Sequence, residues 1–183
     1  MKVHFFGGYR ATKQNVLAWC NSLEKKRQNV IAIGWPYPTA SPASNPLKYW
    51  NCSESVAKVI CVDVGECLLV GHSSGCAIAN DVASKTLALG AKNFKLIALD
   101  GFLPKPELLN LPGTMVWSAE CNGVNSLNYE SSKRTDKFHI YKAKVIKKWP
   151  LHFSLINVNV SDDHGEITQG YRNCDVNTEV LGI

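Results

Sequence analysis

No stretch of this sequence approaches the roughly 18 to 20 continuous apolar residues that a transmembrane helix needs, so we expect no membrane span. The start, residues 1–8, lacks an apolar region long enough for a secretory signal peptide. These two absences predict a soluble protein, most simply a cytoplasmic one.

The seven cysteines contain no Cys-x-x-Cys pair, and their odd number and irregular spacing indicate neither a zinc site nor a redox motif. We expect most of them to be reduced and to fill space in the core as small side chains. The sequence therefore predicts no metal site.

What the sequence does contain is the composition of one globular domain over residues 1–183, with 45% apolar and 19% charged residues. The net charge of +5 is local, because the excess of basic residues falls between Lys133 and Lys148. A general nucleic-acid binder is basic over a broader face, so we expect no nucleic-acid partner. The basic segment is either a patch that meets a phosphate or an acidic partner, or an ordinary solvated face.

Short apolar runs alternate with helical windows, which predicts an α/β fold with a mostly parallel sheet of about six strands and helices on both faces. Four prolines between Trp35 and Pro46 exclude regular structure there, leaving either a substrate-facing loop or a plain surface connection. We expect strands at residues 3–6, 29–34, 67–70, 94–99, 114–117 and 151–160, and helices after a cap at Thr12 and at residues 53–62 and 74–89.

Two of these helices carry apolar residues at helical spacing. The first places Val16, Leu17, Cys20 and Leu23 toward the core. In the helix at 74–89 the apolar residues occupy two faces, one including Leu87 and the other including Leu89, which predicts a central, well-covered helix that ends at Gly90.

Residues 71–75 read Gly-His-Ser-Ser-Gly and match Gly-x-Ser-x-Gly between a buried strand and a long helix, the setting of a nucleophile elbow. The two glycines allow backbone segments to pass closely, and we expect Ser73 in a strained, exposed conformation. The N–H of Ser74, at the start of the helix, is placed to bind an oxyanion. The alternative is a glycine-rich turn without chemistry.

On these residues the sequence resembles the α/β-hydrolase superfamily, from the first strand to His164. The stretch from Gly71 through Asp100 to Pro104 is most similar to thioesterase domains of polyketide and peptide synthases. The resemblance implies a compact single-domain α/β-hydrolase and a serine esterase or thioesterase. It also implies that serine, acid and histidine follow one another in that order along the chain.

Asp100 is the acid that the resemblance implies, because it follows the next expected strand, where these thioesterases carry theirs. Many other hydrolases place the acid one strand later, near residues 120–123, where this chain has no aspartate. Glu120 is therefore the reserve. A carboxylate that merely caps the loop is the alternative for Asp100.

His164 follows the sixth expected strand, where the superfamily has its base, and His152 is its rival. We favour His164 because catalytic groups collect at strand ends, whereas His152 opens a strand. An unpartnered turn histidine is the alternative for His164. His72 is expected to point away from the nucleophile into the core.

The second oxyanion donor is expected in the loop after the first strand, from the N–H of Gly8 or Tyr9. The next residue, Arg10, is either a ligand for a carboxylate or phosphate or a surface residue.

The predicted reaction is acyl transfer from a small-molecule ester or thioester to water, with Ser73 as nucleophile, His164 as base and Asp100 orienting the imidazole. It needs no metal or organic cofactor. One possible substrate is a phosphopantetheine-linked acyl group. The alternative function is a non-catalytic hydrolase-like module that binds a protein partner.

Overall fold

The structure is a computed structural model that describes residues 1–41, 46–63, 65–91, 93–99 and 101, together with the backbone of residues 114–119 and 155–160. The basic segment from Lys133 to Lys148 falls outside these residues. So do four candidate site residues: Asp100, Glu120, His152 and His164.

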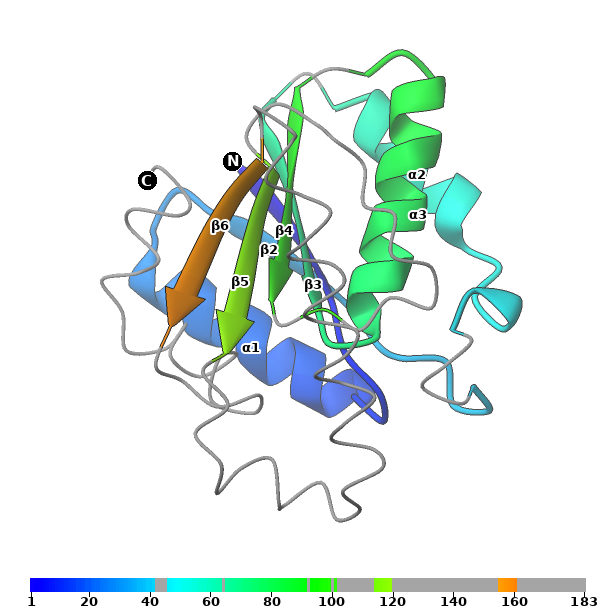
Figure 1. The fold of residues 1–183 in the computed structure, drawn as a ribbon. Coiled ribbons are helices and arrows are strands. Elements are labelled where there is room, and N and C mark those ends of the chain that lie inside the picture. The colour runs from blue at the N-terminus through cyan, green and yellow to red at the C-terminus, as the bar shows by residue number, and fades with distance from the viewer. Residues whose placement is uncertain are drawn as a thin grey trace.

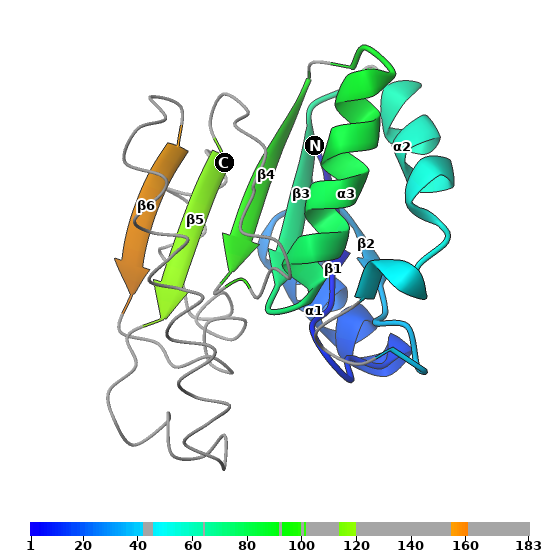
Figure 2. The same ribbon diagram turned by 45° about the vertical axis from the view of Figure 1, so that its right-hand side comes forward.

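Six strands form one sheet in the order β2-β1-β3-β4-β5-β6, and every neighbouring pair is parallel (Figure 2). This confirms the expected strand number and direction, and β4 has the expected bounds. The strands are β1 (Lys2–Phe6), β2 (Ile31–Trp35), β3 (Cys67–His72), β4 (Phe94–Leu99), β5 (Thr114–Ala119) and β6 (Leu155–Val160).

Helices cover both faces of the sheet, as expected: α1 (Lys13–Lys26) lies on one face, and α2 (Ser53–Cys61) and α3 (Gly75–Ala88) pack side by side on the other (Figure 1). Before α2, residues Pro46–Lys48 form a single 3₁₀ turn, η1. No helix among the described residues is long and apolar enough to cross a membrane.

Strand β3 begins with the unbroken apolar run 67–70 because both of its faces are buried. Successive side chains point to opposite faces, so Leu68 and Val70 pack into the cluster beneath α1, whereas Cys67 and Leu69 pack beneath α2 and α3. Thus β3 is enclosed on both sides, and the turn that follows it starts from a rigid strand.

Helix α1 begins where the sequence predicts, because Thr12 caps it. The hydroxyl of Thr12 accepts from the N–H of Asn15 at 3.2 Å, and the Asn15 side chain accepts from the N–H of Thr12 at 2.9 Å. The prediction for Leu17 is wrong, since it is 44% exposed. Trp19 is buried instead and stacks on Phe5, because the spacing 16, 19, 20, 23 follows one helix face better.

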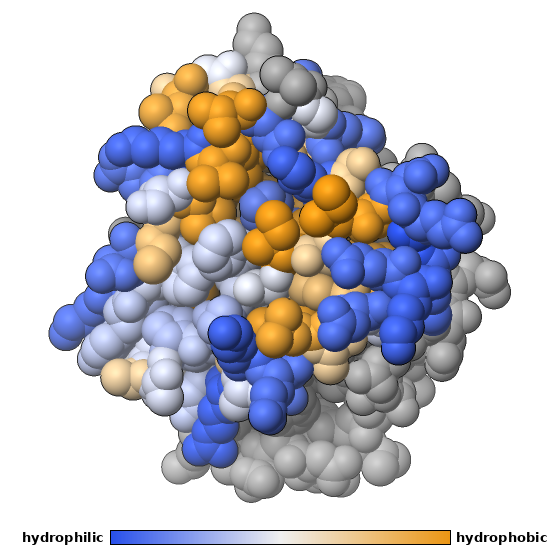
Figure 3. Space-filling model, turned by 180° about the vertical axis from the view of Figure 1, so that it is seen from behind, coloured by the Kyte–Doolittle hydropathy of each residue, from blue (hydrophilic) through white to orange (hydrophobic). Residues whose placement is uncertain are grey.

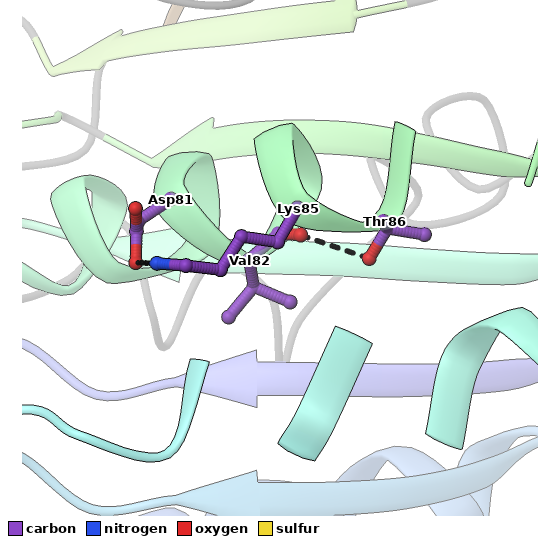
Figure 4. Close-up of polar contacts among 4 residues, drawn as sticks. All are labelled: Asp81, Val82, Lys85 and Thr86. Carbon is purple, nitrogen blue, oxygen red and sulfur yellow. Dashed lines mark hydrogen bonds and ion pairs between the residues drawn. The ribbon is translucent and has the colours of Figure 1, made fainter. Parts of the chain in front are cut away.

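Helix α3 lies against β1, β3 and β4, and Figure 4 shows two polar contacts within it. Within it, the hydroxyl of Thr86 donates to the carbonyl of Val82 at 2.8 Å, which satisfies a fully buried polar group. Lys85 pairs with Asp81 one turn earlier on the helix surface.

The C-terminal end of α3 is more exposed than its apolar sequence predicts. Leu87 and the C-cap Leu89 are 44% and 49% exposed, whereas Thr86 in the same last turn is fully buried, so this turn buries only one face. The helix ends before Gly90, which has a φ of +90° and confirms the expected stop. Figure 3 shows that on the face seen from behind, apolar side chains are interspersed with charged ones.

The described cysteines are all free thiols, as expected: three are buried, Cys61 is half-buried and Cys52 is exposed. Burial raises the pKa of the Cys20 thiol to about 12 and that of Cys67 to about 11. Both therefore remain neutral thiols that fill the core.

Candidate active site

Ser73 occupies the turn between β3 and α3, at the edge of the sheet where the parallel strands end. Its φ is +51°, in the left-handed region that residues with a Cβ rarely adopt. Its N–H donates to the carbonyl of Leu99 at 3.0 Å, and its carbonyl accepts from the N–H of Cys76 at 3.1 Å. The expected strain is therefore present. The expected exposure is not, because Ser73 is only 5% exposed.

The two glycines of the motif are needed because backbone segments cross closely at this turn. A Cβ on Gly71 would lie 2.6 Å from the Cα of Cys76. A Cβ on Gly75 would lie 2.3 Å from the carbonyl oxygen of Phe6 and 2.5 Å from that of Gly7. No side chain fits against backbone at these distances, so both positions require glycine.

The loop after β1 lies directly against the nucleophile. A Cβ on Gly8 would lie 2.8 Å from the Cβ of Ser73 and 3.0 Å from the carbonyl oxygen of His72. The N–H of Gly7 already donates to the carbonyl of Trp35 at 3.0 Å, so Gly7 has no free donor. The N–H groups of Gly8 and Tyr9 have no backbone acceptor within the described part of the chain.

Ser74 provides the donor on the other side of Ser73. It is the cap residue of α3 and is fully buried, and its N–H has no backbone acceptor among the described residues. The N–H groups at a helix start lack partners within the helix and carry partial positive charge. The structure thus brings together Ser73, Ser74 and Gly8, three of the residues that the sequence singles out.

The residues on either side of position 100 both contact the elbow. Leu99 pairs in register with His72 and accepts the N–H of Ser73. Gly101 lies against the first turn of α3, since a Cβ there would be 3.1 Å from the Sγ of Cys76. Asp100 itself lies outside the described residues and stays a prediction.

The two described histidines lie in different environments, and only His72 departs from its expected place. His72 is half-buried rather than in the core, and a Cβ on Gly8 would lie 3.1 Å from its Nδ1. His4 is fully buried, and its Nδ1 accepts from the indole N–H of Trp35 at 3.2 Å. Burial lowers the pKa of His4 to about 4, so it is neutral near pH 7. The base candidates His164 and His152 lie outside the described residues.

A cavity of about 760 Å³ opens beside the elbow, lined by residues 9–13 and 36–41. The two segments are far apart in the sequence, and no motif in the sequence predicts that they face each other. Tyr37 forms the inner wall and is 5% exposed, with its hydroxyl 3.4 Å from that of Ser41. Burial raises the pKa of Tyr37, while the neighbouring side chains of Ser41 and Ser74 oppose that rise. In the sequence, the only sign of this wall is the position of Tyr37 between two prolines.

Within the described ranges, no three His, Cys, Asp or Glu side chains come together where they could hold a metal ion.

No protein-family model matches the chain, and no curated protein matches its sequence. Solved structures do resemble its fold. A protein assigned as a hydrolase of the α/β superfamily, from Xanthomonas campestris pv. campestris, has a TM-score of 0.55 at 13% identity, covering 99% of this chain and 98% of that chain.

Two further structures are described as thioesterases. The one from Silicibacter sp., an assigned thioesterase, has a TM-score of 0.62 at 11% identity and covers 100% of this chain and 75% of its own. The RedJ thioesterase of the prodiginine biosynthetic pathway in Streptomyces coelicolor has a TM-score of 0.57 at 13% identity. The match covers 100% of this chain and 88% of the RedJ chain. The chain has the α/β-hydrolase fold, on which function must be argued from the site.

Proposed function

We propose that this protein is a serine hydrolase that cleaves a carboxylic ester or thioester through an acyl-enzyme on Ser73. The observation that carries the proposal is the left-handed Ser73, in the turn between β3 and α3, against Gly8 and next to the buried N–H of Ser74. A glycine would form this turn without strain, whereas a serine there costs on the order of 1 to 3 kcal/mol. This conformation sets the hydroxyl beside N–H groups that have no backbone acceptor among the described residues.

In the proposed reaction, His164 accepts the proton of Ser73 while the Oγ attacks the carbonyl carbon of the substrate. The N–H of Ser74 and that of Gly8 or Tyr9 bind the oxyanion. The intermediate collapses as His164 returns the proton to the leaving alcohol or thiol. Water, deprotonated by His164, then attacks the acyl-enzyme and releases the acid and free Ser73. Asp100 orients the imidazole and stabilises its charged form.

The assignment of Asp100 is supported by its flanking residues. Leu99 and Gly101 both contact the elbow, one through the N–H of Ser73 and the other at Cys76. The chain between two such contacts has little room to leave the carboxyl end of β4, where catalytic groups of open α/β sheets collect.

The assignment of His164 is supported by the register of the sheet. His72 pairs with Leu99, Leu99 with Trp117, and Trp117 with Val158, so Val158 lies at the same position along the strand direction as His72. Strand β6 therefore extends as far along the sheet as Ser73 before it ends at Val160. Three strand spacings, about 14 Å, separate β6 from β3. The four residues from Val160 to His164 span up to about 14 Å, and the imidazole extends further. His164 therefore has the reach that the proposal needs.

The rival His152 precedes the other end of the same strand. Leu155 lies three residues below the level of His72, so about 17 Å separates these two positions across the sheet. The three residues from His152 to Leu155 span at most about 11 Å. Before the side chain is counted, His152 falls about 6 Å short, whereas His164 falls about 2 Å short of the roughly 16 Å between Val160 and His72, which disfavours His152 as the base.

Labelling with a fluorophosphonate tests the nucleophile. We expect modification at Ser73, identified by peptide mass, and a loss of p-nitrophenyl acetate hydrolysis on the order of 10⁴-fold or more in Ser73→Ala. The matched pair His164→Ala and His152→Ala tests the base, and the loss should be far larger in the first. A folded, unlabelled protein whose Ser73→Ala variant behaves like wild type would identify a non-catalytic module instead.

A further inference from the structure

The cavity beside the elbow is positively charged. Its described lining contains two cations, Arg10 and Lys13, and no carboxylate. None of the ion pairs among the described residues uses either cation. Their charge is thus not neutralised by a described acidic side chain, and it is available to a ligand.

Arg10 is held in place rather than free to move with its loop. It has a φ of +66°, and the turn around it is closed by the N–H of Ala11, which donates to the carbonyl of Gly8 at 2.9 Å. The guanidinium lies over the ring of Tyr9, 5.0 Å from its centroid, and that ring packs edge-on against Tyr37 at 5.8 Å. A stacked guanidinium keeps its N–H edge free for an anion.

Lys13 adds a second charge at the first residue of α1, whose opening turn contains no acidic residue. The positive end of the helix dipole adds to the same potential. The planar guanidinium of Arg10 can bind two oxygens of one anion, and the ammonium of Lys13 adds a compact charge. Together they can bind a phosphate or a carboxylate.

The elbow residues do not line the cavity themselves, but each of its two walls is linked to them by one neighbour. On one wall, Tyr9 directly follows Gly8, which contacts Ser73. On the other, Tyr37 lies beside the side chain of Ser74. A volume of about 760 Å³ falls within the range of small-molecule sites.

From this arrangement we infer that the cavity binds an anionic group, a phosphate or a carboxylate, of the ester or thioester that Ser73 cleaves. Arg10 and Lys13 contact the anion, and Tyr37 closes the wall between it and the reacting carbonyl. The inference rests on the proposed function and adds the substrate class to it.

Two substrate pairs test the inference and separate the sources of the anion. One pair is p-nitrophenyl acetate and p-nitrophenyl hemisuccinate, which differ by a carboxylate on the acyl group. The other is S-acetylpantetheine and S-acetyl-4′-phosphopantetheine, which differ by one phosphate on the leaving group. In at least one pair, the charged member should have a kcat/KM at least tenfold above that of its neutral partner.

Variants then connect this preference to the cavity. Arg10→Gln and, separately, Lys13→Gln should each lower the charged-to-neutral ratio of kcat/KM about tenfold. Lys26→Gln is the matched control, because it removes the same charge from an exposed residue at the opposite end of α1. Using two independent variants keeps the test valid if one of them folds poorly. Equal ratios in wild type and both variants, for both pairs, would overturn the inference.

Binding without turnover separates this inference from the proposed function. Calorimetry on Ser73→Ala with coenzyme A and with succinate should show, for at least one of them, binding that weakens about tenfold when Arg10→Gln is added. If neither pair is hydrolysed and this binding persists, the catalytic proposal fails while the anion site stands. If esters are hydrolysed but no Arg10-dependent binding or preference exists, the anion site is wrong and the hydrolase stands.

Discussion

Replacing Gly8 by alanine tests whether the loop after β1 takes part in catalysis. The added Cβ would lie 2.8 Å from the Cβ of Ser73, 3.0 Å from the carbonyl oxygen of His72 and 3.1 Å from its Nδ1. Ordinary contacts of a Cβ begin near 3.4 Å, so the loop or the elbow must move by about 0.6 Å. The imidazole of His72 can rotate away, but the Cβ of Ser73 and the carbonyl oxygen of His72 are fixed by the backbone.

The expected loss follows from that displacement. A misplacement of about 1 Å costs on the order of 10²-fold in rate, and losing one oxyanion donor costs on the order of 10² to 10³-fold in kcat. For a shift of about 0.6 Å we expect kcat to fall by on the order of 10 to 100-fold. Overpacking of this kind destabilises a fold by about 1 to 3 kcal/mol, which leaves a folded protein to assay.

The assay is steady-state hydrolysis of p-nitrophenyl acetate, with the folded fraction checked by circular dichroism and urea unfolding. Gly65→Ala is the matched control, because a Cβ there would meet only the Oδ1 of Asp63 at 3.9 Å. It should retain the wild-type kcat. If Gly8→Ala is folded and also retains the wild-type kcat, the loop does not supply the oxyanion donor and the argument from close contact is wrong.

Two predictions concern stability. Between pH 7.5 and pH 5 the free energy of unfolding should fall by about 2 kcal/mol through His4, because the unfolded chain takes up a proton at the ordinary pKa of 6.5, whereas burial lowers the folded pKa to about 4. Urea unfolding of wild type and His4→Gln at both pH values measures this share, and equal losses in the two proteins would contradict it. Thr12→Ala removes the α1 cap and should cost about 1 kcal/mol, seen as a lower urea midpoint; an unchanged midpoint would show that the capping box adds nothing.

Much of the fold is readable from the sequence because its signals are local. The apolar run of β4 has the predicted bounds, Thr12 caps α1, and α3 stops before Gly90. The strain at Ser73 is also a local property, since a strand that turns at once into a helix between two glycines leaves the middle residue few conformations. Side-chain period and turn chemistry act over a few residues, and a sequence displays them directly.

Other features depend on which segments meet in space. Leu17 and Leu87 have apolar side chains at plausible helical positions, yet both are exposed because the described elements do not cover the helix faces on which they lie. Gly7 is unsuited as an oxyanion donor because its N–H already donates to the carbonyl of Trp35, which lies on another strand. The cationic cavity exists only because residues 9–13 and 36–41 face each other. Such outcomes are set by contacts between residues distant in the chain, and the pattern around any one residue carries no record of its distant neighbours.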